Sequence, residues 1–148
     1  ARSLVPLLAS DRGGKLEEGR DFVVAGRERH VSISREGLLP YPQRALRVRG
    51  FAYIVNYEPD RWPMGDPHGL EDPSVEVTHA EGLASDTMLV FPDFDASPSK
   101  AWMIQHRGEP EVRQLYELVV GKRPREELYD LQKDPHCMHN VAAEAAYA

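Results

Sequence analysis

The segment from Glu58 to Ser97 constrains the fold of this 148-residue chain more than any other feature. It contains prolines at positions 59, 63, 67, 73 and 92, and each proline fixes φ and removes a backbone N–H donor. No long helix or inner strand is therefore expected here. Loops of this length are uncommon in a compact domain unless they are functional or packed on a neighbour. Regular structure must lie before and after this segment.

Several stretches outside it have the composition of β-strands. Residues 21–25, DFVVA, form a short apolar run that suits a buried strand. Residues 44–49 and 51–57 predict two strands joined by a tight turn at Arg49-Gly50, because glycine accepts the positive φ of hairpin turns. Residues 127–131 alternate as a strand does, and the Asp-Pro that follows predicts a turn.

The helices are expected after the proline-rich segment. Ser97 can cap a helix that has Pro98 at its first position, and Gly108 and Pro110 interrupt that helix. Beyond the break, apolar residues recur at helical spacing and predict a core-facing side that ends before Gly121. These apolar residues are Val112, Leu115, Tyr116 and Val119. The final stretch, NVAAEAAYA, predicts an Ala-rich helix. Strands and helices together predict one α+β domain over residues 1–148.

Charge is distributed unevenly along the chain. Residues 1–50 hold ten Lys/Arg and six Asp/Glu, whereas residues 51–148 hold eight and eighteen. One interpretation is charge scattered over solvated surfaces, and the other is an anion-binding edge in the first third. The groups best placed to contact an anion follow the first strand or lie on the hairpin, and they are Arg27, Arg29, His30, Arg44, Arg47 and Arg49. No run of residues is apolar enough to predict a membrane span.

The sequence HCMHN near the end raises the question of a metal or a nucleophile. His136 and His139 could share one helix face, but zinc sites take three or four ligands and no second Cys/His cluster is present. Cys137 has no neighbouring base and acid to activate it. We expect an exposed turn, with no metal and no catalytic residue in the chain. A metalloenzyme that uses the two histidines is the alternative.

The same end segment carries a family resemblance. ELYDLQKDPHCMHNVA, residues 127–142, resembles the closing signature of sulfatases, and RSLVPLL resembles the segment through which that family leaves its catalytic domain. More narrowly, GRERH, YPQRALRVRGFAYIVNY, PDRWPMGDP and SPSK resemble bacterial sulfatases similar to N-sulfoglucosamine sulfohydrolase, the heparan N-sulfatase. The resemblance runs the length of the chain.

The resemblance implies a fold and a missing half. The family's C-terminal subdomain is a small antiparallel sheet of about four strands packed against a long helix, which we assign to the helix ending near Val120. The catalytic domain would precede Ala1 and would hold calcium and a formylglycine nucleophile. Cys137 is not its precursor, because the residues after it depart from the Cys/Ser-x-Pro/Ala/Ser-x-Arg pattern. The chain, which opens without Met, is expected to be a part without catalytic residues, cofactor or metal.

The resemblance also implies a role for the basic first third. In sulfatases this subdomain closes one side of the cleft and its loops help to select the sugar. Six residues are therefore predicted to line the substrate cleft: Glu28, Arg29, His30, Tyr41, Arg44 and Lys100. The loop at 58–97 is expected to lie against the catalytic domain or over the pocket. The expected partners are that domain and a sulfated saccharide, with no nucleic acid and no membrane.

A second hypothesis is a free-standing module that binds sulfated polysaccharide. If an interface with a catalytic domain has been removed, apolar residues should lie exposed and favour self-association. The residues expected to be exposed are Leu4, Val5, Leu7, Leu8 and Trp62.

Overall fold

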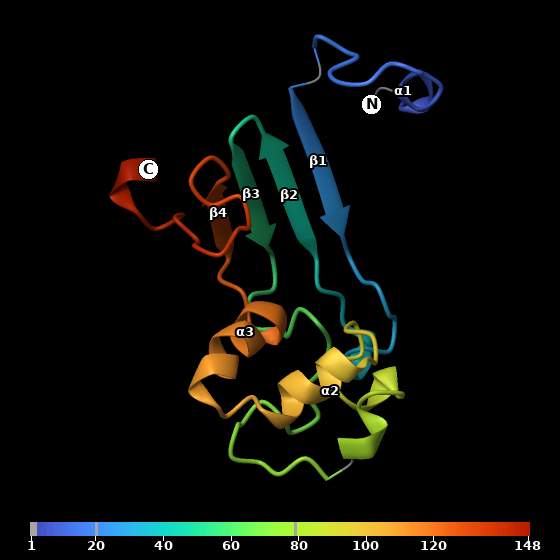
Figure 1. Cartoon of the computed structure of the whole chain (residues 1–148), viewed down its shortest axis with the longest axis vertical. Helices are drawn as coiled ribbons and strands as arrows, with labels where there is room; N and C mark the ends of the chain where they lie inside the picture. Colours follow the sequence, from blue (N-terminus) through green and yellow to red (C-terminus); the bar gives the residue numbers. More distant parts are fainter. Residues whose placement is uncertain (1–2, 20, 79) are drawn as a thin grey trace.

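The structure is a computed structural model that describes residues 3–19, 21–78 and 80–148, and Figure 1 shows its two halves. A β-sheet forms one half, and two helices with the loop before them form the other. The short helix α1 (Val5–Leu8) lies apart from both, near the start of the first strand. In the described ranges, no helix has the length and apolar character to cross a membrane.

Within the described residues, the sheet has four antiparallel strands in the order β1-β2-β3-β4. The four predicted strands are confirmed to within two residues at each end. The turn at Gly50 is also confirmed, with φ at +86°. The strands are β1 (Phe22–Arg27), β2 (Gln43–Val48), β3 (Phe51–Asn56) and β4 (Glu126–Asp130).

One row of paired residues is apolar in all four strands, and most of its neighbours on β1 to β3 are apolar as well. The registers place Val24, Leu46, Tyr53 and Leu128 side by side, and side chains two residues away lie on the same face. The prediction of a buried strand at 21–25 is wrong, because β1 is an edge strand and neither of its faces is covered in the described residues. We call this surface the apolar sheet face, formed by Phe22, Val24, Leu46, Val48, Phe51, Tyr53 and Leu128.

The helical half contains α2 (Pro98–Gln105) and α3 (Pro110–Val120). The Ser97 hydroxyl accepts a hydrogen bond from the Lys100 N–H at 3.1 Å, which confirms the predicted cap. The break at Gly108 and Pro110 is confirmed as well. Gly121 ends α3, where a Cβ would lie 2.5 Å from the Glu117 carbonyl oxygen. At eleven residues α3 is not the expected long helix.

The main core lies in the helical half and not between a helix and the sheet. Both helices pack on side chains of the proline-rich segment, which itself contains two 3₁₀ turns, Ala80–Gly82 and Thr87–Leu89. The segment therefore folds onto the helices that follow it. The core residues are Leu83, Val90, Phe91, Ala101, Ile104, Tyr116 and Val120.

Other expectations need correction. Of the predicted α3 face, Val112 and Tyr116 are buried, but Leu115 is exposed and Val120 takes an inner position. Among the residues expected to be exposed, Leu4, Val5 and Leu8 are so, whereas Leu7 is half-buried and Trp62 packs 5.8 Å from the Phe91 ring.

The predicted C-terminal helix is also wrong. The chain ends in a single 3₁₀ turn, Ala145–Tyr147, because the segment before it is drawn along β4. The Val141 N–H donates to the Leu128 carbonyl at 2.9 Å, and the Tyr147 hydroxyl donates to Asp130 at 3.0 Å. A further 3₁₀ turn, Glu36–Leu38, lies between β1 and β2.

Candidate functional site

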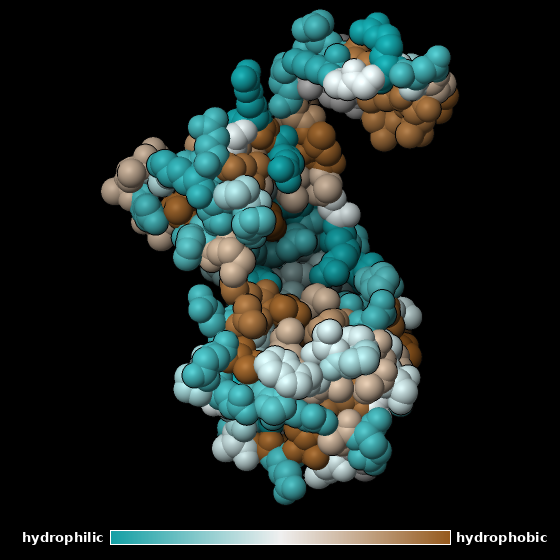
Figure 2. All heavy atoms as spheres, viewed as in Figure 1, coloured by the Kyte–Doolittle hydropathy of each residue, from teal (hydrophilic) through white to brown (hydrophobic). Residues whose placement is uncertain are grey.

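Three of the predicted site residues follow the end of β1. Glu28, Arg29 and His30 are all exposed, and β1 ends at the junction of the two halves (Figure 1). Figure 2 shows a hollow at this junction, lined in that view by hydrophilic residues. The exposed loop end therefore offers a carboxylate, a guanidinium and an imidazole near the junction of the two halves. We call these three residues the rim.

Arg44 joins the rim from the neighbouring strand. It lies opposite Gly26 in the β1–β2 register, and its guanidinium forms an ion pair with the Glu28 carboxylate. A Cβ on Gly26 would lie 2.9 Å from the Arg44 Cδ. The missing side chain therefore lets Arg44 lie across β1 and reach Glu28. Both partners are about half exposed, so the pair is accessible to a ligand.

Tyr41 lies beneath the rim and is fully buried. Its N–H donates to the Glu28 carbonyl at 2.7 Å, and the Arg35 guanidinium lies 5.6 Å from its ring centre. Burial, with a contribution from the Glu127 charge, raises the pKa of Tyr41 to about 12. The hydroxyl is therefore neutral at ordinary pH and has no hydrogen-bond partner among the described residues. Tyr41 supports the rim from inside.

A buried ion pair that the sequence analysis missed lies beside Tyr41. Arg35 and Asp93 are almost inaccessible, and Arg35 Nη2 lies 3.1 Å from Asp93 Oδ2. The same guanidinium donates to the Trp62 and Pro63 carbonyls at 2.9 and 2.8 Å. The pair thus ties the loop between β1 and β2 to the proline-rich segment. The sequence does contain one indication of this pair. Asp93 lies in the apolar stretch LVFPDF, and a charge in such a stretch is buried only when it is paired.

The Asp93 carboxylate also reaches the rim. Its Oδ1 accepts a hydrogen bond from the Val31 N–H at 2.8 Å and lies 3.8 Å from His30 Nδ1. The His30 side chain is 60% exposed, whereas that of Asp93 is not exposed at all. An accessible imidazole thus stands against a buried, fixed carboxylate.

Lys100 does not lie with the other predicted residues. It is fully buried, and its Nζ donates to the carbonyls of Thr87, Phe91 and Phe94 at 3.2, 3.3 and 2.6 Å. Burial lowers the pKa of this amine, and the charges of Asp95 and Asp86 oppose that shift. Its bonds hold the turn that carries Asp93, so Lys100 supports the rim from a distance.

The segment around Cys137 forms a structural turn. His136 and His139 are exposed, and the described residues contain no group of three or more His, Cys, Asp or Glu able to hold a metal ion. The His139 N–H donates to Asp134 at 2.8 Å. Burial and the Asp134 charge raise the pKa of the Cys137 thiol, which opposes formation of a reactive thiolate.

Asn140 fastens this turn to the sheet. Its side-chain oxygen accepts from the N–H groups of Leu128 and Ala142 at 2.9 and 3.0 Å, and its amide donates to the Glu126 carbonyl at 3.0 Å. The side chain therefore occupies the outer edge of β4. Asp134 and Asn140 therefore act in folding this end of the chain.

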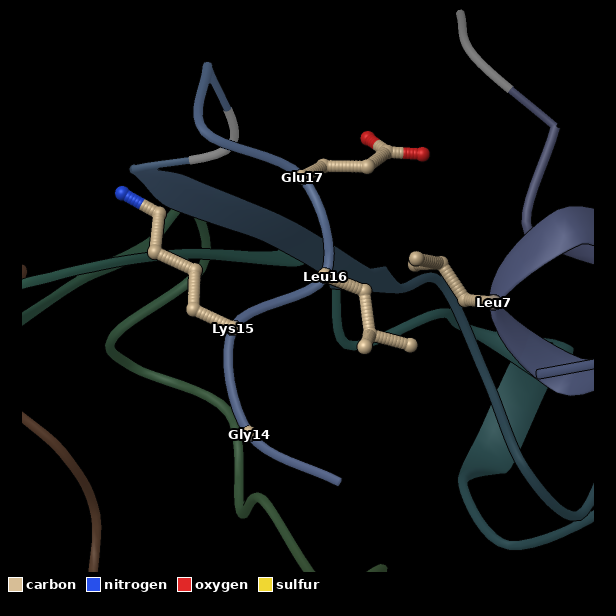
Figure 3. Close-up of a pocket in the computed structure, with 5 residues that line it drawn as sticks. All are labelled: Leu7, Gly14, Lys15, Leu16 and Glu17. Atoms are coloured by element: carbon tan, nitrogen blue, oxygen red, sulfur yellow. The ribbon is translucent and has the colours of Figure 1, made fainter. Parts of the chain in front are cut away.

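Two further hollows lie away from the rim residues. The smaller, of about 290 Å³, lies between α1 and the loop before β1, where Leu7 and Leu16 face each other (Figure 3). The larger, of about 500 Å³, includes Arg35 and the acidic residues Glu36, Asp66 and Glu71 in its lining. None of the six predicted site residues lines either hollow. The structure thus brings together Glu28, Arg29, His30, Tyr41 and Arg44, and it places Lys100 one layer behind them.

Comparison with known proteins finds no match to a protein-family model and no match to a curated protein.

Proposed function

We propose that this chain is the C-terminal, substrate-recognising part of a sulfatase whose complete form hydrolyses sulfate ester or N-sulfate groups on an anionic sugar. The observation that carries the proposal is the rim of Glu28, Arg29 and His30, paired with Arg44 and held on a buried base at the junction of the two halves. In this proposal the chain binds the sugar and performs no chemistry, while calcium and formylglycine belong to the catalytic domain.

The chemistry of the rim suits a sulfated sugar. Guanidinium groups form short, charge-assisted hydrogen bonds to the oxygens of anions, and Arg29 and Arg44 offer such donors. Carboxylate and imidazole groups accept hydrogen bonds from hydroxyls, and Glu28 and His30 offer these acceptors. A ligand that carries both sulfo and hydroxyl groups can bind to the guanidinium donors and to these acceptors, whereas a simple anion can bind only to the donors.

The apolar sheet face supports the proposed partner. Phe22 and Val24 are 60% and 62% exposed, and apolar residues of β2 and β3 continue the face beside them. Contiguous apolar surfaces of this kind mark interaction sites. We propose that the catalytic domain of the parent enzyme covers this face. The uncovered chain should then self-associate at high concentration, which sedimentation velocity would detect.

Two measurements test the function. The purified chain, given an aryl sulfate and calcium, should release no sulfate, and metal-dependent release would overturn the proposal that it lacks chemistry. In calorimetric titration, a heparin-derived oligosaccharide should bind saturably and more weakly as salt rises, because exposed charges are screened.

Variants locate the binding. Arg29→Ala and Arg44→Ala should each weaken it several-fold, since each removes a charge-assisted contact. Arg113→Ala, on the exposed side of α3, is the matched control and should bind like the unaltered chain. Absent binding, or equal losses in all three variants, would contradict recognition at the rim.

A free-standing glycan-binding module is the second candidate, because the rim lies wholly within this chain. Variants of Arg29 or Arg44 do not distinguish the two candidate functions, because both functions use the rim. Variants of the apolar sheet face do distinguish them. If the chain is a free-standing module, Leu46→Lys should leave its glycan affinity unchanged. If the first proposal holds, the same variant should prevent association with an added catalytic domain.

A further inference from the structure

We propose that Asp93 is the positioning residue of the rim: it holds the His30 imidazole with Nδ1 toward the buried carboxylate, so that Nε2 is the ring atom presented to a ligand. The identity of that ligand rests on the proposed function. The orientation of the ring does not.

The contacts of Asp93 show how firmly its carboxylate is fixed. One oxygen accepts from the Val31 N–H at 2.8 Å, and the other accepts from Arg35 Nη2 at 3.1 Å. The Asp93 N–H donates to the Met64 carbonyl at 2.9 Å. Backbone and side chain are thus both held, and the residue cannot turn away from the rim without breaking these bonds.

The surroundings of Asp93 are held as well. Lys100 binds the carbonyls of Phe91 and Phe94, which flank Asp93 in the chain. Arg35 is anchored separately by the carbonyls of Trp62 and Pro63. Two buried cations therefore hold the surroundings of this carboxylate: Lys100 binds the backbone on either side of Asp93, and Arg35 binds Asp93 Oδ2 directly.

His30 meets this carboxylate through a single ring nitrogen. Nδ1 lies 3.8 Å from Asp93 Oδ1, which is the range of a charge contact and longer than a hydrogen bond. A carboxylate beside one ring nitrogen favours the tautomer that carries its proton on that nitrogen. In the neutral ring, Nδ1 therefore carries the proton and the Nε2 lone pair faces outward.

This orientation assigns a task to each rim atom. Nε2 accepts a hydrogen bond from a sugar hydroxyl, while the guanidinium groups of Arg29 and Arg44 take the sulfo oxygens. His30 is then the contact that reads the uncharged part of the sugar, and Asp93 acts through it without touching the ligand.

Nitrogen-15 NMR of the imidazole rings tests the orientation without any ligand. At about pH 8.5, where ordinary histidines are neutral, His30 should show the proton on Nδ1, whereas exposed His136 should behave as an unrestrained imidazole. The His30→Gln variant assigns the signals. Asp93→Asn should move the His30 signals toward those of His136, and Asp72→Asn should not, because Asp72 contacts Ser74 in an exposed turn of the same segment.

Binding supplies the second test. His30→Gln and Asp93→Asn should each weaken a heparin-derived oligosaccharide about fivefold, the size expected for one hydrogen bond. The double variant should lose no more than either single variant, since both remove the same contact. Asp72→Asn should bind normally.

The outcomes separate the two proposals. A His30 ring with its proton on Nε2 in the unaltered chain overturns the inference, and this result needs no variant that folds poorly. Additive losses in the double variant overturn it as well. Correct ring orientation with no glycan binding supports the positioning role of Asp93 and refutes the proposed function, whereas glycan binding with a freely oriented ring does the reverse.

Discussion

In the sheet half, four strands pair along their lengths while one apolar face stays open to solvent, whereas the helical half buries its apolar side chains with little regular pairing. Backbone hydrogen bonds define the first half, and side-chain packing defines the second. The difference shows that regular structure and core need not coincide in one chain. It also places the rim where the two kinds of order meet.

The largest expected effect separates the two halves directly. Phe91→Ala removes a fully buried ring that contacts Trp62 and Tyr116, and such losses cost roughly 3–5 kcal/mol in the free energy of unfolding. Phe22→Ala makes the same chemical change at a site 60% exposed and should cost less than about 0.5 kcal/mol. Urea unfolding measures both, and similar losses would show that the sheet half has a buried core of its own.

A smaller effect compares two lysines. Lys100→Met leaves the carbonyls of Thr87, Phe91 and Phe94 without their buried donor, which should cost roughly 1–3 kcal/mol. Lys15→Met breaks only an exposed ion pair with Asp21, worth less than about 1 kcal/mol. Thermal unfolding of the two variants gives the difference. Equal melting temperatures would mean that the Lys100 amine is replaceable and does not hold the turn around Asp93.

The contrast between the halves also explains what could be predicted from the sequence. Strand pairing depends on local patterns, so the hairpin around Gly50 and the strand at 127–131 were found. The burial predicted for 21–25 is wrong, because apolar composition does not reveal whether another layer covers a strand. The alanines after Asn140 predict a helix, but bonds from Asn140 and Val141 to β4 override that local preference.

The site shows the same limit. The family resemblance indicates Glu28, Arg29, His30, Tyr41 and Arg44, and these residues lie near the end of β1 and the start of β2. Arg35 and Asp93 lie 58 positions apart, and their pairing depends on how the proline-rich segment folds back. Nothing local in the sequence specifies that path. The resemblance also predicts Lys100 as a site residue, but its side chain is fully buried, and no pattern in the sequence indicates that burial.

A further effect appears only at high pH. Burial raises the pKa of Tyr41 and of Tyr116 to about 12, from an ordinary value of about 10. Between these values the unfolded chain loses the phenol protons and the folded chain keeps them, so stability is complete below about pH 10 and falls as the pH rises through 12. Tyrosinate absorbance and circular dichroism, followed together, test this.

The two tyrosines also refine the comparison, because Tyr116 lies in the main core and Tyr41 lies at the junction. Tyr41→Phe and Tyr116→Phe should each make the free energy of unfolding fall less between about pH 10 and pH 12. Ionisation of both residues near pH 10 in a chain that stays folded would show that neither is buried.

The smallest expected effect concerns the turn that follows β4, which is bonded to that strand through Asn140. Asn140→Ala removes an acceptor for the Leu128 and Ala142 N–H groups and a donor to the Glu126 carbonyl, all at an exposed edge that water can reach. The loss in the free energy of unfolding should therefore be about 1 kcal/mol.

His139→Ala is the matched control, because its contact uses only the backbone N–H, and it should change stability by less than about 0.5 kcal/mol. A larger loss for His139→Ala than for Asn140→Ala would assign the imidazole a role that the turn geometry does not provide, and it would reopen the question of a site at Cys137. A larger loss for Asn140→Ala, which we expect, would mean that this segment stabilises β4 through the Asn140 side chain. The sheet half would then be stabilised at its edge and the helical half at its centre.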